Sequence, residues 1–339
     1  NRNFNYEERR EMIRLGTADL ANVTVCEGSA YAISQATFPT YFLKQLDKAS
    51  ENQIELDLQI FARYLASALG ATVRFVGSEP FDPLTRRYNE MMTELLPKSG
   101  IEVVQIERKE LEEKPISASR TRAFIENNKL HAAMQLVPPT TQPYIMAKFA
   151  VDALQQELDT TPKPGLVDKD NSGAHTDMDY ILMERSIKSL RPYFVRLAQL
   201  GLSADKLTTA DVQRIGIEAE AAMLRTTHGV NTHRGALFAL GITVAAAMWL
   251  YAHEGQEVRK ERLQQMIQEI AAGFPPSADT HGAEVVAKAR VKGARENAVE
   301  GYPDLFETWG PYYRKLREDP HRAHRTLLKI MSMLQDTNI

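Results

Sequence analysis

A segment crowded with ligand-type side chains, residues 157–179, separates two stretches with helical periodicity. Its sequence, ELDTTPKPGLVDKDNSGAHTDMD, combines two prolines and two glycines with Lys163, Asp168, His175 and Asp177. Proline and glycine interrupt helices because of their backbone geometry, and Asn and Asp favour turns. We therefore expect a loop that presents ammonium, imidazole and carboxylate groups to a ligand.

Two further polar clusters follow, and each leads from a helical pattern through a glycine-containing turn into the next helix. They are EAEAAMLRTTHGVNTHRGALF (218–238) and VKGARENAVEGYPDLF (291–306), with Glu218, Asn231, His233, Arg234 and Arg295 as candidates. Helical bundles build sites from facing helices and their end loops, so the three segments predict one polar pocket. HExxH and CxxC spacings are missing, whereas hard carboxylates suit Mg²⁺ that carries phosphates.

Each of these residues also has a purely structural interpretation. Asn231 or Thr232 could cap the helix that follows, and Asp177 could cap the helix expected near residue 178. Arg295 and Glu296 could be solvated surface charges. The repeated placement of such side chains beside glycines favours a site over three unrelated turns.

The elements that must position these residues are helices. Helical patterns cover residues 143–158, 178–200, 208–225, 236–253, 257–272, 281–299 and 320–335. The run 236–253 is nearly apolar, but it is just short of a comfortable membrane span and no second span accompanies it. We interpret it as a helix buried inside a bundle and expect no membrane association.

The first part of the chain instead alternates strands with helices. Strands are expected at 22–28, 72–79 and 101–109, and helices at 54–70 and 83–97. This order indicates a Rossmann-like parallel sheet, and the continuous apolar runs predict strands covered on both faces. The proline-rich stretch 136–144 marks the boundary. We therefore predict an α/β domain over 1–142 and an all-α helical domain over 143–339.

Bulk properties exclude several classes of protein. The net charge of −3 and a pI near 6.3 give no support for nucleic-acid binding. The single cysteine, Cys26, is expected to be a buried thiol in a strand and fits a reducing compartment. The N-terminal residues do not form a signal peptide, so a cytoplasmic location is expected.

Two groups of residues in the α/β domain suit a nucleotide, because ligands bind at the carboxyl ends of parallel strands. Gly77 and Glu79 follow one strand, and Ser117, Ser119 and Arg120 begin a helix whose free N–H groups suit phosphate. The alternative is an ordinary helix cap followed by a solvated arginine.

The segments GTADLANVTV, ATFPTYFLK, FVGSEPFDPLTRRYNEMM and PISASRTR resemble citrate lyase ligase, of the nucleotidyltransferase superfamily. The resemblance implies an enzyme that uses ATP to form acetyl adenylate and acetylates the citrate lyase acyl carrier protein. It also implies that residues 77–79 lie near adenosine and that Ser117, Ser119 and Arg120 hold phosphates. The superfamily's H-x-G-H motif would precede residue 1, so we expect this domain to be incomplete at its N-terminus and inactive as a ligase.

The segments TTPKPGLVDKDNSGAHTDMD, GIEAEAAMLRTTHGVNTHRGALFALG and KGARENAVEGYP resemble triphosphoribosyl-dephospho-coenzyme A synthase. The resemblance implies a transferase that makes the citrate lyase prosthetic-group precursor from ATP and 3′-dephospho-CoA and releases adenine. The family continues the DTN segment into Arg-Gly-Gly, whereas this chain stops at Ile339, so we expect this domain to be clipped at its C-terminus.

The implied chemistry assigns roles to the candidates. Asp177 and Glu218 are expected to be the base or Mg²⁺ ligands, and His175 the acid. Lys163, Asp168, Asn231, His233, Arg234 and Arg295 are expected to bind the substrates. Two alternatives stay open: a non-catalytic module that binds ATP or citrate lyase subunits, and the synthase that serves malonate decarboxylase.

Overall fold

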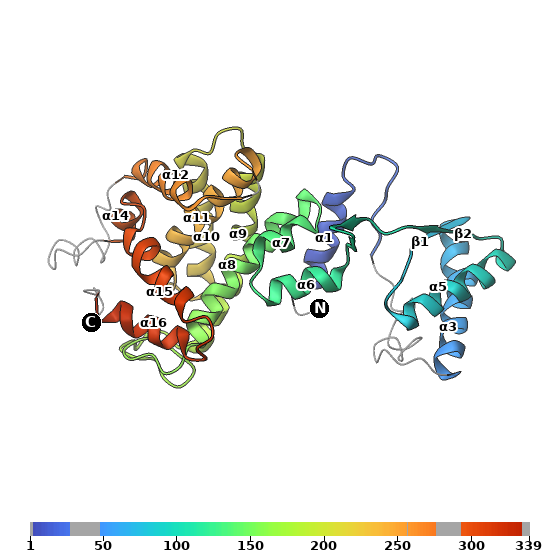
Figure 1. Ribbon diagram of the computed structural model, residues 1–339, viewed down its shortest axis with the longest axis horizontal. Coiled ribbons are helices and arrows are strands. Elements are labelled where there is room, and N and C mark those ends of the chain that lie inside the picture. The colour runs from blue at the N-terminus through green and yellow to red at the C-terminus, as the bar shows by residue number, and fades with distance from the viewer. Residues whose placement is uncertain (1–2, 28–47, 256, 276–292, 334–339) are drawn as a thin grey trace. The chain divides into compact units, whose positions relative to one another are not determined.

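The computed structural model describes residues 3–27, 48–255, 257–275 and 293–333, and its helices and strands are drawn in Figure 1. The chain forms two compact units: residues 9–120 form one, and residues 1–8 with 121–339 form the other. Residues 121–142, predicted to belong to the first domain, thus fold with the helices. Arg191 holds the first residues to the same unit through the Asn3 carbonyl, at 2.8 Å, and an ion pair with Glu8.

The α/β unit is built on one pair of parallel strands. Strands β1 (Val73–Gly77) and β2 (Glu102–Ile106) pair with Phe75 opposite Val104. Its other elements are α1 (Tyr6–Gly16), which continues from the first residues, α3 (Lys48–Ile60), a π-helical turn (Phe61–Ala66), α4 (Ser67–Leu69), α5 (Pro83–Leu95), a 3₁₀ turn (Leu96–Ser99), β3 (Glu110–Leu111), β4 (Lys114–Pro115) and the start of α6 (Ala118–Glu126). The strands expected within 72–79 and 101–109 and the helices within 54–70 and 83–97 are confirmed.

Helices α3 and α5 pack on the same face of these strands. Val76 and Val103 contact a core that includes Ile54, Leu84 and Met92. The alternate side chains face away from this core, so Phe75 is 65% exposed and Ile106 is 53% exposed. The prediction of strands covered on both faces is therefore wrong for the described residues, because both covering helices lie on one side.

Two predictions for the first residues of this unit are also wrong. Residues 22–27 form no strand, since the described part of the chain supplies them with no pairing partner. Cys26 is consequently exposed rather than buried. Residue 28, the end of the expected strand, lies outside the described residues.

The regular elements of the second unit are all helices among its described residues. Besides the rest of α6 it contains α7 (Leu130–Gln135), a 3₁₀ turn (Pro139–Thr141), α8 (Gln142–Asp159), α9 (Tyr180–Ser203), α10 (Thr209–Thr226), α11 (Arg234–His253), α12 (Lys260–Ala272), α14 (Ala294–Val299), a π-helical turn (Leu305–Trp309), α15 (Gly310–Lys315) and α16 (Arg322–Met331). These confirm six predicted helices within about three residues of their bounds, where described. Of the seventh, 281–299, only α14 is described.

Helix α11 lies among the other long helices of this unit (Figure 1). A Cβ atom at Gly201 of α9 would lie 2.3 Å from the Ala245 carbonyl oxygen of α11, so only glycine permits this approach. Among the described residues, α11 is the helix that is long enough and apolar enough to cross a membrane. In its most apolar 18-residue stretch, 44% of the residues are buried inside the protein. That burial agrees with the predicted bundle helix.

Candidate functional site

The loop between α8 and α9 is organised around the carboxylate of Asp168. This side chain is 1% exposed and accepts hydrogen bonds from the backbone N–H groups of Lys163 (2.7 Å), Asp170 (2.8 Å) and Asn171 (3.0 Å). Burial alone would raise the pKa of Asp168, but these N–H groups and the Lys163 charge lower it below its usual value. Asp168 therefore stabilises the conformation of the loop through hydrogen bonds to the loop's own backbone.

Two glycines close the same loop on itself. Gly165 and Gly173 both have positive φ, at 75° and 58°, and the Ala174 N–H donates to the Gly165 carbonyl at 3.1 Å. A Cβ atom at Gly173 would lie 2.4 Å from the Gly165 carbonyl carbon, whereas one at Gly165 would meet nothing within 4 Å. The close approach therefore needs glycine at 173 for space as well as for φ.

This difference predicts unequal effects of two alanine substitutions. Gly165→Ala should lower the free energy of unfolding by about 1 kcal/mol, the cost of a left-handed alanine. Gly173→Ala should cost at least twice as much, because the backbone of residue 165 must also move. Urea denaturation measures both, and equal costs would show that the loop relaxes freely around residue 173.

Lys163 points its ammonium group into the protein. The side chain is 2% exposed, and Nζ lies 2.6 Å from Glu157 Oε1, whose side chain is 52% exposed. Lys163 also lines a cavity of about 350 Å³ between α8 and α16. Thr326 lines it as well, and its buried hydroxyl has no hydrogen-bond partner among the described residues. The cavity therefore borders the Lys163–Glu157 ion pair.

His233 is buried at the start of α11 and is hydrogen-bonded on one nitrogen. Nδ1 lies 2.9 Å from Ser186 Oγ, and the Thr232 hydroxyl donates to the same oxygen at 2.6 Å. If Ser186 donates to Nδ1, the imidazole proton lies on Nε2; if Nδ1–H donates to Ser186, Nε2 is an acceptor. Nε2 is buried and has no hydrogen-bond partner among the described residues.

His233 is neutral in this environment. Burial, assisted by the positive charge of Lys163, lowers the pKa of His233 to about 4. At neutral pH the ring is therefore uncharged. Ser186, 0% exposed in α9, was not identified from the sequence, because a serine on an apolar helix face carries no signal before its partner is placed.

Asn231 and Arg234 lie on either side of this histidine. Asn231 Oδ1 accepts from the Arg234 N–H at 3.2 Å, but the N-cap residue of α11 is His233, without a side-chain cap bond, and the Thr232 hydroxyl donates to Ser186 instead. The Arg234 guanidinium pairs with Glu220. Glu218, the carboxylate predicted for the site, is instead bound by Arg196 at 2.6 Å.

The remaining predicted residues of the helical unit are more exposed. Asp179 rather than Asp177 caps α9, accepting from Leu182 N–H at 2.8 Å. Asp177 is 60% exposed and lies 3.8 Å from Nδ1 of His175. Arg295 donates from Nε to the Phe274 carbonyl at 2.9 Å, so it ties α14 to the end of α12. Asp336, the first residue of the C-terminal DTN segment, lies outside the described residues.

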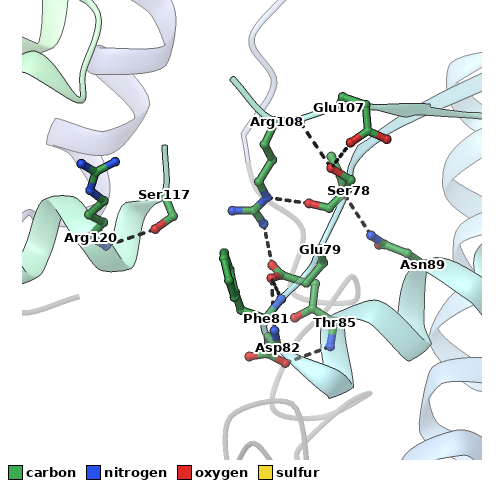
Figure 2. Close-up of polar contacts among 11 residues, drawn as sticks. Ser78, Glu79, Phe81, Asp82, Thr85, Asn89, Glu107, Arg108, Ser117 and Arg120 are labelled. Atoms are coloured by element: carbon green, nitrogen blue, oxygen red, sulfur yellow. Dashed lines mark hydrogen bonds and ion pairs between the residues drawn. The ribbon is translucent and has the colours of Figure 1, made fainter. Parts of the chain in front are cut away.

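In the α/β unit, the loop after β1 borders a cavity of about 820 Å³ at the carboxyl end of the strands. Figure 2 shows Glu79 accepting the N–H groups of Phe81 and Asp82 and pairing with Arg108 at 2.5 Å. Gly77 accepts from the Asn89 amide at 2.9 Å through its carbonyl. Glu79 thus holds the loop in shape beside the cavity.

Ser117 and Arg120 make contacts around the β3–β4 hairpin. Ser117 Oγ accepts from the Arg120 N–H at 3.1 Å, as a helix cap does (Figure 2). The Arg120 guanidinium donates to the carbonyls of Leu111 and Lys114. Ser117 is therefore the ordinary helix cap that the alternative interpretation expected, whereas Arg120 is bound to backbone carbonyls rather than simply solvated. Ser119 is exposed on α6.

These features define a two-unit protein whose helical unit gathers a buried lysine and a neutral histidine at the ends of its long helices. The chain belongs to the ATP:dephospho-CoA triphosphoribosyl transferase family, whose model matches residues 144–339. The citrate lyase ligase C-terminal domain model matches residues 1–145. Both resemblances drawn from the sequence are thereby confirmed.

Relatives are similar to one half of the chain or the other. A probable 2-(5''-triphosphoribosyl)-3'-dephosphocoenzyme-A synthase of Pseudomonas fluorescens is 38% identical, over 61% of this chain and 74% of its own. A second, from Azotobacter vinelandii, is 37% identical with the same coverage. The [citrate [pro-3S]-lyase] ligase of Escherichia coli is 46% identical over 42% of each chain, so this chain spans less than half of that relative. No solved structure matches.

Proposed function

We propose that the helical unit transfers the triphosphoribosyl group of ATP to 3′-dephospho-CoA and releases adenine. The ribose 2′-oxygen of dephospho-CoA forms a bond to C1 of the ATP ribose while the bond from C1 to the adenine nitrogen breaks. The hydroxyl loses its proton and the departing adenine gains one, so atoms and charges balance. Family membership and the names of the relatives support this reaction.

The observations that carry the proposal are the buried ammonium group of Lys163 and the buried His233 imidazole, which is near enough for the Lys163 charge to lower its pKa and whose Nε2 has no hydrogen-bond partner among the described residues. A triphosphate needs cations and donors that are already desolvated, because charge-assisted hydrogen bonds are strongest away from water. In this proposal Lys163 supplies the charge, and the neutral His233 ring donates through Nε2. Thr326 lines the same cavity as Lys163.

Asp177 fits the role of base better than Glu218 does. Its carboxylate is 60% exposed and near His175, whereas Glu218 is engaged by Arg196, which also lowers the Glu218 pKa. Among the described residues no three His, Cys, Asp or Glu side chains group as a metal site. Mg²⁺ commonly binds through substrate phosphates and one or two carboxylates, which suits Asp177, and it would neutralise phosphate charge.

Adenine release tests the function directly. Purified protein should release adenine from ATP only when dephospho-CoA is present, as chromatography of the reaction would show. Release at the same rate without dephospho-CoA would indicate a nucleosidase. No release, together with measurable ATP binding, would favour the non-catalytic binding module.

Asp177→Asn is expected to slow adenine release by about 10²–10⁴-fold, the usual contribution of a general base. Asp170→Asn is the matched control, because Asp170 is an exposed carboxylate of the same loop. Single-turnover measurement of adenine would compare the two. A wild-type rate in Asp177→Asn would exclude this residue as the base and return attention to Glu218.

For the α/β unit we infer an ATP-binding, citrate lyase ligase-like role, with residues 77–79 and the 820 Å³ cavity as the nucleotide site. This role implies that citrate lyase acyl carrier protein is the partner. It also implies a location in the cytoplasm. The citrate-type first half also favours citrate lyase over malonate decarboxylase as the enzyme served. Isothermal titration of the protein with ATP would compare the affinity of the wild type with that of Arg108→Met. A lower affinity in the variant would support a nucleotide in this cavity.

A further inference from the structure

A second cavity of the helical unit, of about 230 Å³, lies between α9, α10 and α11. Its walls are mostly apolar and include Leu197, Leu237 and Ile242, and Phe274 closes one side. The rings of Phe238 and Phe274 meet edge to face with centroids 5.0 Å apart. The cavity is smaller than the roughly 300 Å³ of pockets that enclose drug-sized ligands, so it suits one ring system rather than a whole nucleotide.

Gly216 gives independent support for a ligand in this cavity. It lies inside helix α10, where glycine costs roughly 1 kcal/mol relative to alanine. A Cβ atom there would meet nothing within 4 Å, so helix packing does not require the glycine. Gly241, on the facing helix, differs, because its Cβ would lie 3.3 Å from Leu197. The open wall at Gly216 therefore leaves room for something other than protein.

The cavity has one polar edge, where Gln213, Glu220 and Arg234 line it. Arg234 pairs with Glu220 through its terminal nitrogen, while its Nε is buried without a hydrogen-bond partner among the described residues. An apolar slot with aromatic walls and a few donors and acceptors at one edge matches a purine, which has flat faces and a polar rim.

The cavity is also connected to the proposed phosphate site through the chain itself. Arg234 follows His233 directly, so the first turn of α11 contributes one residue to each. The two features share a helix end, as the parts of one substrate would require.

We propose that this cavity is a purine pocket that holds the adenine base of one of the two nucleotide substrates. The inference rests on the proposed function of the helical unit, since both of its substrates carry adenine. The base lies between the Phe238–Phe274 wall and the open face of Gly216, and its polar rim meets Glu220 and Arg234.

Gly216→Leu tests the pocket by filling it. Leucine improves helix propensity and meets no neighbour at Cβ, so the variant should fold with an unchanged or raised melting temperature. Ala210→Leu, on the exposed side of the same helix, is the matched control. Isothermal titration of both variants and wild type would use ATP, dephospho-CoA and 4′-phosphopantetheine, which has no base.

The expected result is a loss of about 10- to 100-fold in affinity for one adenine nucleotide in Gly216→Leu, as stacking energies imply. A loss of affinity for ATP assigns the pocket to the adenine of ATP. A loss of affinity for dephospho-CoA alone assigns it to the adenine of dephospho-CoA, the acceptor substrate. Unchanged affinity for both, or an equal loss for 4′-phosphopantetheine, would overturn the proposal. Wild-type protein that binds ATP but releases no adenine would refute the proposed function and leave the pocket standing.

Discussion

Replacing Lys163 with methionine should slow adenine release by about 10²–10³-fold, with a raised KM for ATP. Methionine keeps most of the side-chain volume, so the change removes chiefly the buried ammonium group. Preorganised charges that meet a substrate anion away from water commonly contribute this much. The stability cost should be small, because the abandoned partner, Glu157, is 52% exposed and can be hydrated.

Lys169→Met is the matched control for this prediction. Lys169 belongs to the same loop and pairs with Asp159 at 3.2 Å, but its side chain is 49% exposed. Its loss should change adenine release less than about two-fold, as expected for a solvated ion pair. Steady-state kinetics with varied ATP would separate the variants, and equal effects at both lysines would mean that loop charge in general, rather than the buried ammonium, matters.

The free energy of unfolding should fall by up to about 3 kcal/mol as pH is lowered from 6.5 to 4, because of His233 alone. The pKa of this residue is about 4 in the folded protein and near 6.5 in the unfolded chain. Below pH 6.5 the unfolded chain therefore binds a proton that the folded protein excludes. About one pH unit above 6.5 and higher, both states are neutral, so the contribution there is constant.

His233→Asn should remove this part of the pH dependence, whatever its effect on absolute stability. His228→Asn is the control, because His228 is exposed and has φ of +54°, a conformation that asparagine tolerates. Urea denaturation between pH 4 and 8 measures both. A His233→Asn profile parallel to the wild type would show that the imidazole is protonated in the folded state near its usual pKa.

Sequence patterns predicted the helical unit well and the α/β unit in part. Helices α8, α9, α10 and α12 follow apolar periodicities, and α11 follows a long apolar run, so local sequence predicts all five. The strand expected at 22–28 was inferred from β-branched residues alone, and β-branched composition does not supply a partner strand. Cys26 was misplaced for the same reason, since its burial depended on that strand.

The candidate site shows the same division. Lys163, Asp168 and His233 were singled out by residue type and by neighbouring glycines, but their roles were not distinguishable. The Asp168 carboxylate accepts from backbone N–H groups of its own loop, and Glu218 pairs with Arg196 on another helix. Both outcomes depend on contacts that no spacing rule contains.

The sequence by itself determined the two-part organisation, the helices and the family, because these follow from local periodicity and from long motifs. Only the tertiary structure decided that Ser186, 47 residues before His233, orients its ring, and that the Lys163 charge helps to keep that ring neutral. Burial and charge are properties of the surroundings in three dimensions. A shifted pKa, an unpaired polar atom or an open space beside Gly216 therefore exists only after the chain has folded.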